Sequence, residues 1–212
     1  ERAIRARVAA ELPEHGVVGE EYGTERAGAP VRWFVDPIDG THNFMRGVPI
    51  FATLLAAEAD GELVLGMMSA PALGERWWAA RGLGAWARGR DGERRTRVSG
   101  VAAIEDAQIL YASGRADARS GLMPGFGKLL EAVWRDRGFG DFWGYALVAE
   151  GAAEAMIETG LNPYDIAAPL VIVEEAGGRV TDVEGRRGIE LGSFVATNGL
   201  LHEEVRRRLR GG

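Results

Sequence analysis

Val31-Arg32-Trp33-Phe34-Val35 is an apolar run that leads directly into Asp36-Pro37-Ile38-Asp39-Gly40-Thr41. Its β-branched and aromatic residues predict a buried strand over 31–35 that is closed by a turn signal. Two carboxylates therefore stand at the carboxyl end of this strand. Because Pro37 has a fixed φ angle and no N–H, we expect residues 36–39 to form a stiff bend that aims both carboxylates into one volume.

Two like charges held together require a cation. When only oxygen ligands are available, the expected ion is Mg²⁺, which binds one or two carboxylates and leaves other positions for water and substrate phosphate. Gly40 and Thr41 then open a short helical or turn segment whose backbone N–H groups can face a phosphate. The plainer alternative is that Asp39-Gly40 forms only a tight turn and that Asp36 only caps a strand.

Three stretches resemble one known family. The string Asp36-Pro37-Ile38-Asp39-Gly40-Thr41-His42-Asn43-Phe44 closely resembles the signature of the inositol-monophosphatase-like family of metal-dependent phosphomonoesterases. Gly19-Glu20-Glu21 resembles a Gly-Glu-Glu element in which the first Glu is a metal ligand, with Glu21 as the fallback. Asn162-Pro163-Tyr164-Asp165 resembles the second signature, although Tyr164 replaces the common Trp and Asp165 would otherwise only complement a helix dipole.

This resemblance runs from about Arg2 to the end and implies a layered α/β/α/β/α sandwich of the inositol-monophosphatase/fructose-bisphosphatase type. It also implies two or three Mg²⁺ ions, with Glu20, Asp36 and the carbonyl of Ile38 on one and Asp36, Asp39 and Asp165 on another. The backbone of Gly40 and Thr41 would hold the phosphate. The implied catalytic residues are Thr41, Glu20 and Asp39, acting in an in-line attack by water with no phosphoenzyme.

An Asp-bearing Thr-x-x-Asp stretch that helps to orient the water in this family does not precede Glu20 here. The first residue is Glu, and we expect an N-terminal part of the natural protein to be missing from this chain. The alternative is an inactive, metal-binding relative that serves as a regulatory or binding module.

The substrate expectation also comes from the resemblance. Gly140-Asp141-Phe142, Trp77-Trp78 and two other short stretches, 46–49 and 69–73, look most like the family's histidinol-phosphate phosphatase members, which act in histidine biosynthesis. Asp141 and Glu158 would bind the cationic leaving portion, and a Trp face could stack on its imidazole ring. The alternatives are a helix N-cap for Asp141, packing on alternate strand faces for the Trp pair, and an inositol or broad sugar-phosphate substrate.

Composition sets the remaining limits. The chain has 212 residues, 46% hydrophobic and 26% charged, so it can form one domain, 1–212, with approximate halves 1–105 and 106–212. A net charge of -6 argues against general binding of nucleic acid, and the absence of Cys excludes a disulfide framework and a thiolate metal site. No run reaches transmembrane length, so we expect a soluble cytoplasmic protein, without membrane partners, that forms a homodimer.

Periodicity and turn residues predict the other elements. A first helix over 1–12 ends at His15-Gly16, and a large antiparallel sheet includes a hairpin turn at Asp60-Gly61. Residues 111–125 are expected to be a loop. Asn162, Pro163 and Gly177 bound a helix as N-cap, first residue and stop. The other predicted segments are a strand at 17–18, helices at 126–134, 142–150 and 202–209, and strands at 153–158, 179–181 and 194–197.

Overall fold

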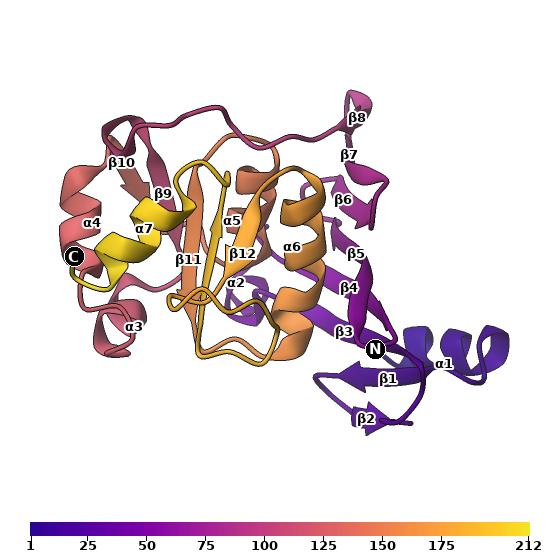
Figure 1. Ribbon diagram of the computed structural model, residues 1–212. Coiled ribbons are helices and arrows are strands. Elements are labelled where there is room, and N and C mark those ends of the chain that lie inside the picture. Colours follow the sequence, from indigo (N-terminus) through magenta and orange to yellow (C-terminus); the bar gives the residue numbers. More distant parts are fainter.

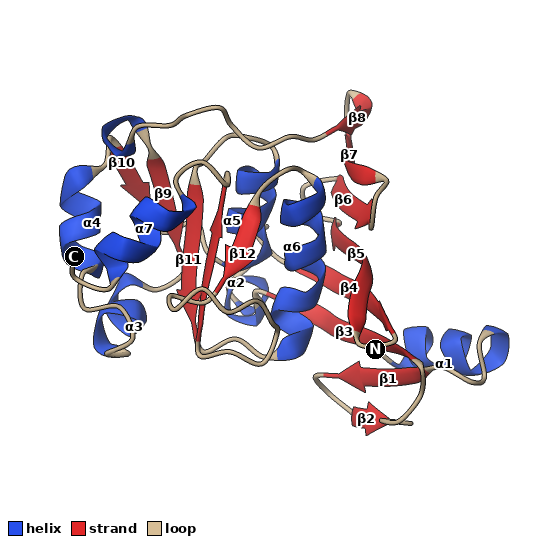
Figure 2. Ribbon diagram, viewed as in Figure 1, coloured by secondary structure: helices blue, strands red, loops and turns tan.

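The computed structural model contains two β-sheets separated and flanked by helices (Figures 1 and 2). It describes the side chains of residues 1–115 and 119–212. The larger sheet has eight strands in the order β2-β1-β3-β4-β5-β6-β7-β8 and is antiparallel except where β1 pairs with β3. Its strands are β1 (Gly16–Gly19), β2 (Gly23–Glu25), β3 (Val31–Asp39), β4 (Ala52–Ala59), β5 (Glu62–Ala70), β6 (Glu75–Ala80), β7 (Gly84–Gly89) and β8 (Gly92–Arg95).

The second sheet has five strands in the order β10-β9-β11-β13-β12. They are β9 (Gln108–Tyr111), β10 (Arg135–Arg137), β11 (Ala155–Thr159), β12 (Arg179–Thr181) and β13 (Ser193–Thr197). The helices are α1 (Arg2–Glu11), α2 (Thr41–Met45), α3 (Gly114–Arg119), α4 (Phe126–Ala132), α5 (Asp141–Ala149), α6 (Pro163–Glu175) and α7 (His202–Leu209), with a 3₁₀ turn at Ile104–Asp106.

The middle layer consists of α5 and α6, which lie between the two sheets (Figure 1). Alternation along the strands shows this: Phe34 of β3 and Leu110 of β9 both point into the main core around α6, whereas Val35 and Ile109 point outward. The outward residues pack under α1 on one side and under α4 and α7 on the other. The layered sandwich expected from the sequence is therefore confirmed.

Local signals also placed most elements correctly. Asp60 and Gly61 both have positive φ angles, 51° and 82°, as a two-residue hairpin turn with the twist of the flanking strands requires. Asn162 forms a capping box with the third helical residue of α6, Pro163 is the first helical residue, and Gly177 follows the end at a φ of 96°. The helix boundaries in this segment are thus those that the sequence predicted.

Several expectations were wrong in detail. The strand that was expected to end at Val35 continues to Asp39. A register shift in its pairing with β4 lies between Asp36 and Asp39, so Pro37, which has no N–H, does not have to donate a hydrogen bond to the sheet. The first helix ends at Glu11, and Gly16 begins β1 instead of ending the helix. The predicted loop 111–125 contains α3. Three short strands, β2, β8 and β10, were not predicted; β2 and β8 are exposed throughout.

In the part of the chain that the structure describes, no helix combines the length and apolar character needed to cross a bilayer.

Candidate functional site

Five elements meet at one place: the ends of β1 and β3, the short helix α2, and the N-termini of α5 and α6. Asp36 is 2% exposed, and it lies on the same face of β3 as Phe34, which packs in the core around α6. Asp165 occupies the first turn of α6. The topology therefore brings together carboxylates that are separated by well over 100 positions in the sequence.

Asp36 is the centre of this group, because its carboxyl group lies close enough to those of Glu20 and Asp165 to shift their pKa values and to be shifted by them. Burial, followed by the negative charges of Asp39, Glu20 and Asp165, raises the pKa of Asp36 to about 9. Glu20 lies at the exposed rim, and partial desolvation raises its pKa as well. Carboxyl groups this close together repel one another when they are ionised, and either a proton or a divalent cation can relieve that repulsion.

Backbone donors fix the two motif carboxylates. The N–H of Ile38 donates to Asp36 Oδ1 at 2.9 Å, and the N–H of Phe142 donates to Asp39 Oδ2 at 2.7 Å. Burial raises the pKa of Asp39 well above its usual range, and the charge of Asp141 adds to this, while the Phe142 N–H opposes it. Asp165 is held by the N–H of Asn162 at 2.8 Å, and burial raises its pKa too. Asp165 therefore caps α6 and faces the cluster at the same time.

The Gly40-Thr41 segment turns the chain from β3 into α2. Gly40 has a φ of 79°, and a Cβ there would lie 2.8 Å from the carbonyl oxygen of Ile50, so only glycine fits. The hydroxyl of Thr41 donates to the carbonyl oxygen of Ile38 at 2.9 Å. As the residues that open a helix, Gly40 and Thr41 have N–H groups with no intrahelical acceptor. This confirms the expected short helical segment after the motif.

Two further carboxylates border the cluster. Asp141 is the first residue of α5, after the N-cap Gly140, and its side chain accepts a hydrogen bond from Asn43 Nδ2 at 2.9 Å. Its N-cap alternative is therefore wrong. Burial raises the pKa of Asp141, and His42 opposes this shift. Glu158 is buried and accepts a hydrogen bond from the hydroxyl of Tyr145 at 3.1 Å. The charges of both carboxylates raise the pKa of Asp39, so all three groups share one region.

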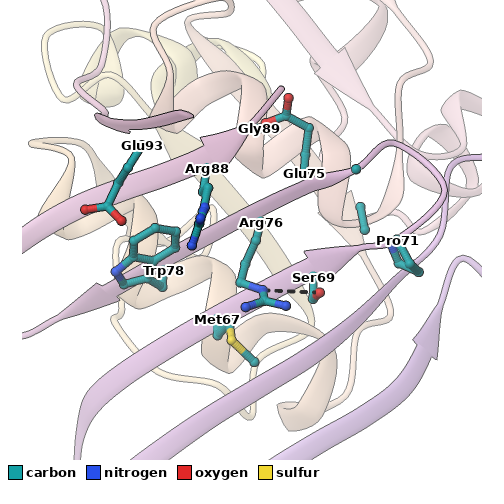
Figure 3. Close-up of a pocket in the computed structure, with 11 residues that line it drawn as sticks. Met67, Ser69, Pro71, Glu75, Arg76, Trp78, Arg88, Gly89 and Glu93 are labelled. Carbon is teal, nitrogen blue, oxygen red and sulfur yellow. Dashed lines mark hydrogen bonds between the residues drawn. The ribbon is translucent and has the colours of Figure 1, made fainter. Parts of the chain in front are cut away.

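The tryptophan pair packs on alternate strand faces. Trp77 is 3% exposed, lies in the main core and donates from Nε1 to Glu150 at 2.8 Å. Trp78 points to the opposite face of the large sheet, where it lines a cleft of about 590 Å³ together with Arg76 and Arg88 (Figure 3). The two side chains lie on alternate faces as the alternative predicted, but only Trp77 packs in the core, and Trp78 lies on the face of the sheet opposite to Asp36, away from a substrate ring bound beside Asp36.

The donor set of the cluster fits Mg²⁺. Among the described side chains, no Arg or Lys forms an ion pair with Glu20, Asp36, Asp39 or Asp165. Within those same residues, no group of three acidic or histidine side chains is already arranged around one metal position. The fit therefore rests on chemistry: several carboxylate oxygens and the Ile38 carbonyl, mutually repelling and without a protein cation, are the ligands that a hard divalent ion prefers.

The sequence reasoning missed three groups that hold this site. They are the side chains of Asn43 and Tyr145 and the N–H of Phe142. Asn43 lies inside the quoted motif, two residues after Thr41, and its position there was an available signal. Nothing in the sequence indicates the other two, because their acceptors lie on other elements.

The comparisons with known proteins agree with this geometry. The model of a family described as the inositol monophosphatase family matches residues 1–211. The chain is 48% identical to a Mycobacterium tuberculosis protein named histidinol-phosphatase, covering 100% of this chain and 82% of that protein. It is 43% identical to a histidinol-phosphatase of Streptomyces coelicolor, with 97% and 79% covered. Its fold is similar to that of an IMPase from Thermotoga maritima, with a TM-score of 0.87, 34% identity and coverage of 99% and 80%.

Proposed function

Because the chain belongs to the inositol monophosphatase family, whose members are phosphoric monoester hydrolases and are generally metal-dependent, usually on Mg²⁺, we propose that it hydrolyses histidinol phosphate to histidinol and phosphate. The observation that carries the chemistry is the carboxyl cluster centred on Asp36. The observation that carries the choice of substrate is the pair Asp141 and Glu158 beside it.

The proposed metal ligands are the carboxylates of Glu20, Asp36, Asp39 and Asp165 and the carbonyl of Ile38, which would together hold two or three Mg²⁺ ions. When bound, these ions neutralise the phosphate ester, lower the pKa of water and stabilise the leaving alkoxide. The protein's own contribution is to hold the ligands. The N–H groups of Ile38, Phe142 and Asn162 donate to three of the carboxylates. These hydrogen bonds orient the carboxylate oxygens before any ion or substrate arrives.

Gly40 and Thr41 form the proposed phosphate subsite. Their backbone N–H groups, which open α2, can donate to the two phosphate oxygens that face them. The Thr41 hydroxyl donates its hydrogen bond to the Ile38 carbonyl, so its lone pairs can accept a hydrogen bond from the attacking water and orient that water. Together with Thr41, the carboxylates of Glu20 and Asp39 make up the proposed catalytic set.

Asp141 and Glu158 form the proposed subsite for the leaving group. Histidinol carries an ammonium group and an imidazole ring, and both can donate to carboxylates. A neutral donor helps to orient each of these carboxylates: Asn43 donates to Asp141, and Tyr145 donates to Glu158. An inositol or sugar phosphate offers only hydroxyl groups, so this pair favours the cationic ester.

The test is phosphate release by the purified protein with Mg²⁺ from histidinol phosphate, inositol 1-phosphate and a hexose phosphate. We expect kcat/KM for histidinol phosphate to exceed that for the other esters by at least about tenfold, the value of one charge-assisted hydrogen bond. Faster hydrolysis of inositol 1-phosphate would establish the alternative activity. Failure of the full-length protein to turn over any ester would point to the inactive, binding relative. The cytoplasmic location and the homodimer stay predictions.

A further inference from the structure

One side-chain contact joins α2 to the start of α5. The Asn43 Nδ2 group donates to Asp141 Oδ2 at 2.9 Å, across 98 positions of sequence. Next to it, the N–H of Phe142 donates to Asp39 at 2.7 Å. The first bond acts on the side chain of Asp141 and the second on the peptide that follows it.

These bonds hold Asp141 in a backbone conformation that residues other than glycine rarely adopt. Its φ angle is 56°, in the left-handed region, which costs most residues about 1 kcal/mol and Asp or Asn somewhat less. The turn brings the carboxylate beside Gly40, at the border between the proposed phosphate and leaving-group subsites: a Cβ placed on Gly40 would lie 3.4 Å from Asp141 Oδ2. Without the bond from Asn43, the side chain has other rotamers that point away from this position.

The chemistry of the donor matters as much as its position. Asn43 is neutral, and among the described side chains no Arg or Lys forms an ion pair with Asp141. An arginine in the same place would orient the carboxylate equally well, but it would also satisfy its charge. Apart from His42, whose charge opposes the rise in the pKa of Asp141, the amide leaves this carboxylate available to a cation from outside the protein.

We propose that Asn43 is a positioning residue that sets the preference for a cationic leaving group by aiming Asp141 at it. This inference rests on the proposed function, since it presupposes that the cationic ester is the better substrate. Helix α2 would then have a second role: besides placing Gly40 and Thr41 next to the phosphate, it would orient Asp141 through Asn43.

The test compares Asn43→Ala with the wild-type protein on histidinol phosphate and on inositol 1-phosphate, both with Mg²⁺. We expect KM for histidinol phosphate to rise about tenfold, as for loss of one hydrogen bond to a charged group, with kcat within about twofold. Both constants for inositol 1-phosphate should stay unchanged. Met45→Ala is the matched control, because Met45 lies on the same helix and is 76% exposed.

A second variant separates the loss of the donor from the loss of volume. Asn43→Asp keeps the size of the side chain and replaces the amide by a carboxylate that repels Asp141 at pH 7.5. We expect a rise in KM for histidinol phosphate at least as large as that of Asn43→Ala. The two variants together also guard against a misfolded alanine variant, whose circular dichroism would be checked first.

The outcomes are distinguishable. If the wild-type protein shows no preference for histidinol phosphate, the proposed function and this inference fall together. If the wild-type protein is selective and both variants remain equally selective, only the role of Asn43 falls. Equal losses on both esters, mainly in kcat, would show that Asn43 merely supports the helix that carries Thr41, and would also overturn the inference.

Discussion

Two sets of acidic side chains lie side by side at this site, and they are held in different ways. Glu20, Asp36 and Asp165 lie close together, and the negative charges of Glu20 and Asp165 both raise the pKa of Asp36. Asp141 and Glu158 are instead each hydrogen-bonded by a neutral side chain. The first set therefore requires a positive charge among its carboxylates. In the second set, each carboxylate is oriented beside the cluster by a hydrogen bond.

The difference separates two requirements of a phosphatase. Cleavage of any phosphate ester requires strong positive charge near the phosphate, and a buried cluster of carboxylates is the protein's means of gathering it. Choosing one ester requires contacts that the other esters cannot make. We therefore expect changes in the cluster to affect all esters alike, and changes in the pair to affect only the cationic one.

The largest effect is expected for Asp39→Asn. Loss of this carboxylate should lower kcat at least about a thousandfold for histidinol phosphate and inositol 1-phosphate alike, in line with the removal of a group that acts on the transition state. The fold should be retained, because the amide oxygen can still accept from the Phe142 N–H. Asp60→Asn, in the β4–β5 turn, is the matched control. Activity within severalfold of wild type would mean that the metal position has been assigned wrongly.

The next effect concerns stability. The folded pKa of Asp36 is about 9, against 3.8 ordinarily, so the folded state binds more protons than the unfolded state between these values. In EDTA, the contribution of this group is therefore fully present below about pH 4 and is lost as the pH rises through 9. We expect thermal melting to occur several degrees lower at pH 8.5 than at pH 5.5.

Magnesium should remove that loss. At about 100 times its Kd, Mg²⁺ should stabilise the fold at pH 8.5 by about 2.7 kcal/mol for one site. Asp36→Asn should both flatten the pH dependence in EDTA and weaken the response to Mg²⁺. A variant that melts with the wild-type pH slope and the wild-type Mg²⁺ shift would contradict the central position of Asp36. Differential scanning calorimetry measures both quantities.

A smaller, selective effect is expected for Asp141→Asn. Asn also tolerates the left-handed φ of this position and can accept the same bond from Asn43, so the variant removes charge and little else. KM for histidinol phosphate should rise about 10- to 30-fold, the cost of about 2 kcal/mol of charge-assisted bonding, with little change for inositol 1-phosphate. Steady-state kinetics on the two esters would show it, and equal losses on both would place Asp141 in the cleavage machinery instead.

The smallest effect is expected for Tyr145→Phe. The change removes one hydroxyl from Glu158 and leaves a ring that still fills the buried space. We expect a loss of about three- to tenfold in kcat/KM for histidinol phosphate, in the range of one ordinary hydrogen bond. Inositol 1-phosphate should again be the insensitive comparison, and a loss shared by both esters would argue that Tyr145 acts through packing around α5.

Local sequence predicted the parts of this molecule that are decided by neighbouring residues. The capping box of α6, the hairpin at Asp60-Gly61 and the helical turn after Asp39-Gly40 depend on backbone geometry within a few positions, and all were found where the residues predict them. The layered architecture came from the family resemblance of the motifs, because periodicity alone gave only a mixture of helices and strands.

Tertiary structure alone decided how the carboxylates are held. No pattern within β3 shows that Asp36 will contact the first turn of α6, or that Asp39 will accept a hydrogen bond from α5. The continuation of β3 through Pro37 also depends on its pairing with β4. Sequence therefore determined which chemical groups the protein carries and the local turns that present them. Only folding determined which charges share one low-dielectric space, because distance and burial are properties of the packed chain and not of its order.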